Sequence, residues 1–91
     1  MKKFSRTEIE KKVNDILVDK LGVGYSGIKD DSRLKQDFDA DSLDAVEIVI
    51  DLEHEFGISI SDEEMDFILS PKVVDVYDFV ERLLNNNHQK V

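Results

Sequence analysis

The sequence predicts an all-α fold, a small bundle of three main helices plus one short helix, with a long loop between helices one and two. The chain has 91 residues, so residues 1–91 are expected to form one domain. Apolar residues recur at the period of an α-helix, and no segment alternates polar and apolar residues as a half-buried strand would. Residues that start or stop helices also flank each periodic segment.

The first helix is predicted over residues 5–21. Ser5 and Glu8 are spaced as a capping box, and Gly22 follows the last apolar position as a stop signal. A long connection, residues 22–40, comes next and is rich in Gly, Asp and Ser. Its isolated apolar residues are expected to anchor it to the core: Ile28, Leu34 and Phe38.

The second helix is predicted over residues 41–56, between the N-cap Asp41 and the stop signal Gly57. Ser61 and Glu64 form a second capping box, which opens a short third helix over residues 62–69.

The last helix is predicted over residues 71–85. Ser70 reads as its N-cap and Pro71 as its first helical residue. The polar residues 86–91 are expected to form a flexible tail.

The charge of the chain is strongly negative and concentrated in its middle. The formal charge is −9, from 21 acidic and 12 basic residues, and residues 37–66 contain acidic residues with no Lys or Arg. Such a balance disfavours nucleic acid and anionic membranes and favours partner proteins with basic surfaces. The chain has no cysteine and no long apolar segment, so we expect a cytoplasmic protein without membrane insertion.

On a helical wheel, the second helix has more apolar surface than a small core requires. One arc suits the core and contains Ala45, Ile48, Val49, Leu52 and Phe56. An acidic strip follows another arc, at Asp44, Glu47, Asp51, His54 and Glu55. The surplus apolar residues, Leu43, Val46 and Ile50, border this strip and are either buried under the long loop or exposed as a contact edge. Because no base interrupts the acidic run, we expect its negative field to serve a basic partner.

The segments 38–47, 52–60 and 62–64, in this order, closely resemble the acyl carrier proteins, and the likeness extends over about residues 7–84. This resemblance implies that the hydroxyl of Ser42 is esterified to a 4′-phosphopantetheine arm. Coenzyme A donates the arm, and a separate phosphopantetheinyl transferase attaches it with Mg²⁺. The thiol of the arm then carries acyl groups as thioesters, so the chain itself is a non-catalytic carrier. The implied pathways are fatty-acid, lipid or polyketide biosynthesis.

The same resemblance implies a partner-binding face on the second helix, at Asp41, Leu43, Asp44, Val46, Glu47, Ile50, Asp51 and Glu53. Its partners would be the transferase and synthase, acyltransferase or ketosynthase enzymes with basic surfaces, and the carrier is expected to be a monomer. The chain has Asp39 where the family usually has Gly and Ser61 where it often has Pro. Asp39 matters more, because a non-glycine residue tolerates positive φ less well.

Two alternatives remain open in the sequence: an acidic helical interaction module that is never modified, and a carrier for aminoacyl groups. A calcium loop beginning at Asp37 fails because Ser42 and Ile48 occupy its glycine and glutamate positions. Two histidines far apart in sequence, His54 and His88, give no basis for a zinc site or a catalytic triad. We therefore expect neither metal-binding nor catalytic residues.

Overall fold

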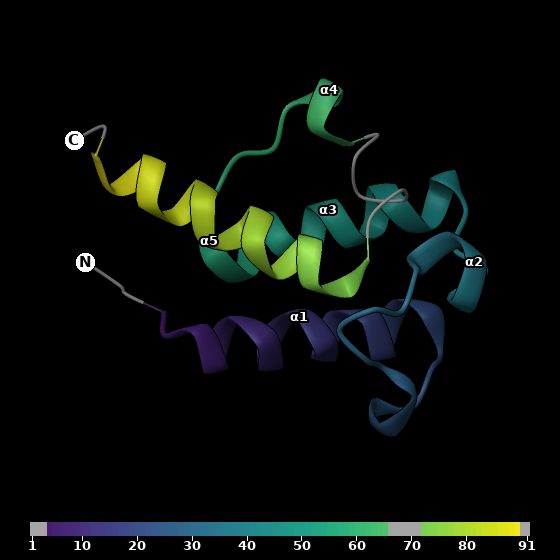
Figure 1. Ribbon diagram of the computed structural model, residues 1–91. Coiled ribbons are helices and arrows are strands. Elements are labelled where there is room, and N and C mark those ends of the chain that lie inside the picture. The colour runs from purple at the N-terminus through teal and green to yellow at the C-terminus, as the bar shows by residue number, and fades with distance from the viewer. Residues whose placement is uncertain (1–3, 66–71, 90–91) are drawn as a thin grey trace.

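The computed structural model describes residues 4–65 and 72–89, and its regular elements are helices (Figure 1). They are α1 (Arg6–Leu21), the 3-10 turn η1 (Tyr25–Gly27), α2 (Leu34–Phe38), α3 (Ser42–Phe56), α4 (Asp62–Met65) and α5 (Val73–Gln89). The all-α prediction is confirmed, with α1, α3 and α5 as the three main helices.

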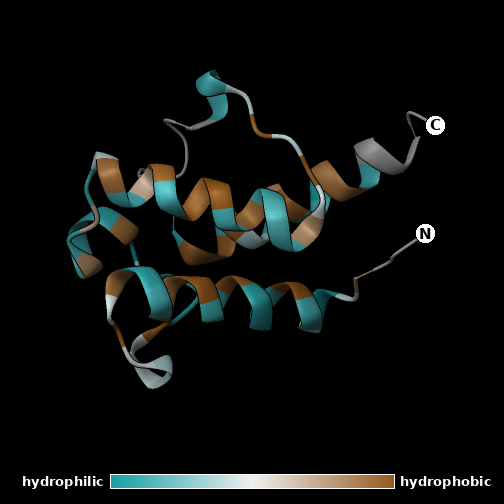
Figure 2. Cartoon of the chain, turned by 180° about the vertical axis from the view of Figure 1, so that it is seen from behind, coloured by the Kyte–Doolittle hydropathy of each residue, from teal (hydrophilic) through white to brown (hydrophobic). Residues whose placement is uncertain are grey.

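The three main helices pack against one another around a common core. Figure 2 shows apolar stripes on α1, α3 and α5, on the sides where α1 faces the other two helices. Each helix contributes residues at helical spacing, as the sequence periodicity predicts. The most deeply buried side chains include Ile9, Val13, Leu17, Leu34, Ile48, Leu52, Val73, Val76, Phe79 and Val80.

Polar and aromatic contacts fasten α1 to its neighbours. The Arg6 guanidinium lies 2.8 Å from Asp78 and 2.8 Å from Glu81, both on α5, and stacks over the ring of Tyr77. At the same end of α1, the ring of Phe4 meets that of Phe56 edge to face, with 5.0 Å between centroids. These contacts close the end of the bundle opposite to the beginning of α3.

The predicted limits of α1 and α3 agree with the structure. Ser5 caps α1, where the Glu8 N–H donates to the Ser5 hydroxyl over 3.1 Å and the Ser5 N–H donates to the Glu8 carboxylate over 2.9 Å. Gly22 and Gly57 end α1 and α3 with φ of 69° and 66°, which glycine adopts without strain.

The long connection is more ordered than the sequence indicates. It contains η1 and α2, which a prediction of a plain loop over residues 22–40 missed. Elements this short complete no hydrophobic period, so only their anchors are visible in sequence. Those anchors are confirmed: Leu34 is fully buried, and Ile28 and Phe38 pack against the core.

The last helix also differs from its prediction. Lys72 is not helical, α5 begins at Val73 and it continues to Gln89, so residues 86–89 are helical and not a flexible tail. Residue 71 of the predicted helix and residues 90 and 91 of the predicted tail lie outside the described residues. No Gly or Pro interrupts the polar end of the sequence, and polarity alone does not stop a helix. The capping box of Ser61 and Glu64 opens α4 as predicted. The rest of the predicted short helix, with Ser70 and Pro71, lies outside the described residues.

Hydrogen bonds join the connection between α1 and α2 to the helices α1 and α5. The Tyr25 hydroxyl donates to the Asp15 carboxylate on α1 over 2.6 Å. The Val73 N–H at the beginning of α5 donates to the carbonyl of Ser32 over 2.8 Å, next to a bridge between Arg33 and Lys72. These bonds fix the segment that leads into α2 and α3.

Replacing Tyr25 by Phe is expected to raise the pKa of Asp15. The Tyr25 hydrogen bond is the largest cause that holds this pKa below its ordinary value, with a smaller contribution from Lys11. A lowered folded-state pKa stabilises the fold above about pH 4, and this contribution is lost as the pH falls through the folded pKa. Carboxyl titration by NMR measures the shift. Tyr77→Phe is the control, because Tyr77 donates to Asn14 instead, and an unchanged Asp15 pKa in Tyr25→Phe would contradict the assignment.

Candidate functional site

Ser42 is the first residue of α3, and its side chain is exposed. Serines at this end of a helix usually serve as caps. Here the cap is Asp41, which accepts from the Asp44 N–H over 2.9 Å, while the Asp44 carboxylate accepts from the Asp41 N–H over 3.1 Å. In the part of the chain that the structure describes, no hydrogen bond engages the Ser42 hydroxyl. The ordinary structural role of such a serine is therefore already filled.

The segment before Ser42 is held in place by α2. Ala40 is buried in the core, and its N–H donates to the carbonyl of Leu34 over 3.1 Å. Asp39 ends α2 with φ of 57° and is the one non-glycine residue with positive φ among those described. Asp39 thus has the positive φ that glycine adopts most readily, and aspartate tolerates this conformation better than most residues.

The beginning of α3 can receive an anionic group on Ser42. The capping box uses the N–H groups of Asp41 and Asp44, which leaves those of Ser42 and Leu43 without intrahelical partners. Free N–H groups and the positive end of the helix dipole favour a phosphate at this place. An exposed, uncommitted hydroxyl beside these groups fits a phosphodiester linkage.

The two apolar groups of residues on α3 that the helical wheel distinguishes differ in burial. All five residues assigned to the core arc are buried. The surplus residues are exposed: Leu43 by 66 %, Val46 by 39 % and Ile50 by 46 %. Of the two outcomes that the sequence left open, the structure therefore has the exposed contact edge, which begins directly after Ser42.

The acidic strip is partly neutralised by α1, contrary to our expectation. Lys20 lies 3.4 Å from Asp51, and Lys12 lies 3.0 Å from Glu55. The hydrogen bond with Asp51 raises the pKa of Lys20. Residues 37–66 contain no Lys or Arg, but these two bases come from another helix. Within the described residues, Glu47 makes no ion pair or hydrogen bond, so the part of the acidic strip without a direct partner lies nearer to Ser42.

Glu53 has a structural role that the sequence did not indicate. Its carboxylate accepts from the N–H of Ile60 over 2.9 Å, and its backbone carbonyl accepts from Gly57 and Ile58. Glu53 thereby holds the turn that follows α3. No sequence signal could have found this contact, because it depends on how the turn folds back.

The structure therefore brings most of the predicted site residues together on the outer face of α3. Asp51 and Glu53 belong to the same helix but contact α1 and the following turn. A separate open groove between α1 and α3 is polar, and it is lined by Lys12, Asp15, Ile16, Asp19, Asp51, His54 and Glu55. None of the helices described is long and apolar enough to cross a membrane.

Comparison with known proteins gives an independent result for this region. Residues 11–80 match a family model described as the phosphopantetheine attachment site. An acyl carrier protein of Chloroherpeton thalassium is 42 % identical over 77 residues, which cover 85 % of this chain and 90 % of the relative. One of Campylobacter hominis is 42 % identical over 79 residues, with coverages of 87 % and 98 %. One of Thermotoga maritima is 40 % identical over 80 residues, with coverages of 88 % and 96 %.

Proposed function

Because this chain belongs to the phosphopantetheine attachment family, we propose that the Ser42 hydroxyl is the attachment point of its arm. The family and its relatives make the chain an acyl carrier protein, which carries acyl groups on a covalently attached 4′-phosphopantetheine arm. One observation carries the choice of residue. Ser42 is exposed at the first turn of α3, while Asp41 and Asp44 provide the cap that a serine there would otherwise supply.

The arm supplies a thiol that holds an acyl group as a thioester. The chain has no cysteine, so it adds no thiol of its own that could compete for the acyl group. Its own residues present the hydroxyl, leave N–H groups free beside it and hold α2 against the core. We therefore propose a non-catalytic carrier that is a substrate of its partner enzymes.

The proposed partner face consists of the eight predicted residues of α3 and its cap. Leu43, Val46 and Ile50 support this assignment, because exposed apolar side chains next to carboxylates suit a basic partner with an apolar pocket. The proposed partners are a phosphopantetheinyl transferase and synthase, acyltransferase or ketosynthase enzymes with basic surfaces. Asp51 and Glu53 also hold intramolecular contacts, so their contribution to binding is proposed to be smaller.

The assignment of fatty-acid, lipid or polyketide biosynthesis remains a prediction, as do the cytoplasmic location and the monomeric state. A carrier of aminoacyl groups would use the same arm and differs only in cargo. An unmodified acidic module would lack the arm altogether.

Incubation of the bare protein with coenzyme A, Mg²⁺ and a broad-specificity phosphopantetheinyl transferase tests the assignment. We expect the intact mass to rise by one arm in the wild type and to stay unchanged in Ser42→Ala. Ser61→Ala is the matched control, because Ser61 also stands at the beginning of a helix but caps α4. This control should gain the arm. Loading of Ser42→Ala, or a wild type that stays bare, would overturn the proposal.

A further inference from the structure

Three carboxylates near Ser42 oppose the negative charge that the free N–H groups at the beginning of α3 favour. Asp39, Asp41 and Asp44 all lie within a few residues of its hydroxyl. The carboxylates of Asp41 and Asp44 accept hydrogen bonds from backbone N–H groups. A phosphodiester on Ser42 would add a fourth negative group, and like charges at short range repel one another.

All four Lys and Arg residues of α1 already have partners inside the molecule. Carboxylates lie within ion-pair distance of Arg6, Lys11, Lys12 and Lys20. Lys35 differs, because it is exposed and has no ion-pair partner in the described ranges. It is also the last Lys or Arg before Ser42, and none follows until Lys72.

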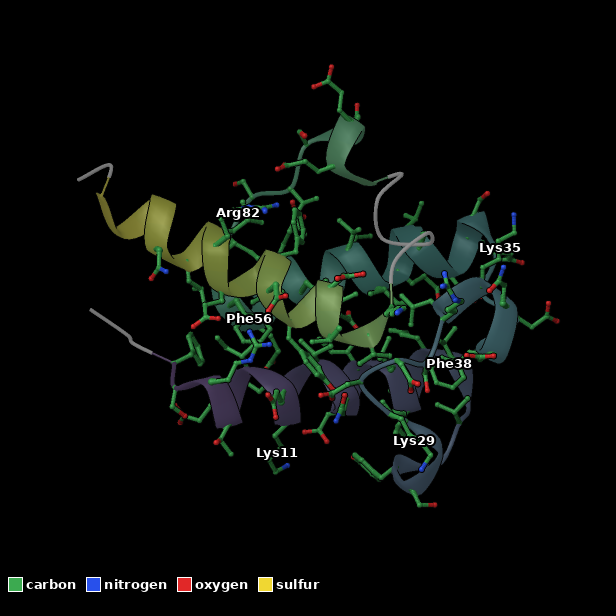
Figure 3. The ribbon with its side chains drawn as sticks, in the orientation of Figure 1. Lys11, Lys29, Lys35, Phe38, Phe56 and Arg82 are labelled. Carbon is green, nitrogen blue, oxygen red and sulfur yellow. The ribbon has the colours of Figure 1, made fainter. Side chains whose placement is uncertain are left out.

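The fold places Lys35 at the end of the molecule where α3 begins. The neighbouring Leu34 carbonyl accepts from the Ala40 N–H, so the chain turns back on α2 immediately before Ser42. Figure 3 shows Lys35 on α2, at the end of the molecule where α3 begins, whereas Lys29 lies near η1. The two lysines therefore carry the same charge on different parts of the connection.

We propose that the Lys35 ammonium group is the counter-charge of the phosphodiester on Ser42 and holds the proximal part of the arm against the beginning of α3. This inference rests on the proposed attachment at Ser42. Lys35 acts as a positioning residue: it does not touch the reacting thiol, and it offsets the repulsion from the three neighbouring aspartates. The remaining free N–H groups of α3 stay available to the same phosphodiester.

A thermodynamic cycle between the arm and Lys35 tests the proposal. The variants are Lys35→Met, which removes the charge, Lys35→Arg, which keeps it, and Lys29→Met, which removes the same charge near η1. Urea unfolding is measured for the bare and the arm-bearing form of each variant and of the wild type, at low salt and at about 1 M NaCl.

We expect attachment of the arm to lower the folding equilibrium constant of Lys35→Met by about two- to five-fold more than that of the wild type. Lys35→Arg and Lys29→Met should respond as the wild type does, and the difference should vanish at high salt. An equal response of all four proteins at low salt would overturn the role of Lys35 and leave Ser42 as the attachment point. If the wild type cannot be loaded, both proposals fail together.

Discussion

Reversing the charge of Glu47 is expected to lower kcat/KM for attachment of the arm by a phosphopantetheinyl transferase by at least about ten-fold at low ionic strength. Glu47 is exposed on the outer face of α3 and makes no ion pair or hydrogen bond in the described part of the chain. Glu47→Lys should therefore leave the fold intact while it removes attraction for a basic partner. At about 1 M NaCl the defect should shrink, because salt screens exposed charges.

The choice of Glu47 over Asp44 follows from the capping box. Asp44→Lys would also break the hydrogen bond to the Asp41 N–H, so a slower reaction could reflect a frayed helix. Asp31→Lys is the control for overall charge, since Asp31 is exposed in the turn before α2. Equal rates for Glu47→Lys and the wild type at low salt would remove Glu47 from the partner face.

Replacing Leu52 by Ala is expected to reduce the free energy of unfolding by about 2–5 kcal/mol. Leu52 is fully buried between the three main helices, so truncation leaves a cavity that the neighbouring side chains cannot fill. Ile50→Ala is the matched control on the same helix. Because Ile50 is 46 % exposed, its truncation should cost about 0.5 kcal/mol or less. Urea unfolding of both variants measures the contrast, and similar losses would contradict the division of α3 into a core arc and a contact edge.

The elements that the sequence predicts best are those with strong local signals. Ser5 and Asp41 at helix starts, and Gly22 and Gly57 at helix ends, define α1 and α3 because caps act through neighbouring residues. The sequence does not predict the 3-10 turn and α2, because elements this short complete no hydrophobic period. A tertiary contact such as that of Tyr25 with Asp15 leaves no local signal either.

The candidate site follows the same rule. Helical geometry predicts the surplus apolar edge of α3 but leaves its exposure open, and the family resemblance points to Ser42. The structure shows that both the edge and Ser42 are exposed. The geometry of one helix does not predict the ion pair of Asp51 with Lys20, because the two residues lie on different helices. The contact between Glu53 and the Ile60 N–H also depends on tertiary folding. Local chemistry is therefore visible in the sequence, whereas the partners of individual charges require the assembled bundle.

Fragmentation mass spectrometry of the protein isolated from its native host tests the central claim most directly. We expect the intact protein to carry one 4′-phosphopantetheine arm, and fragments to place it on Ser42. Host material that is entirely bare, or an arm found on another serine, would contradict the account.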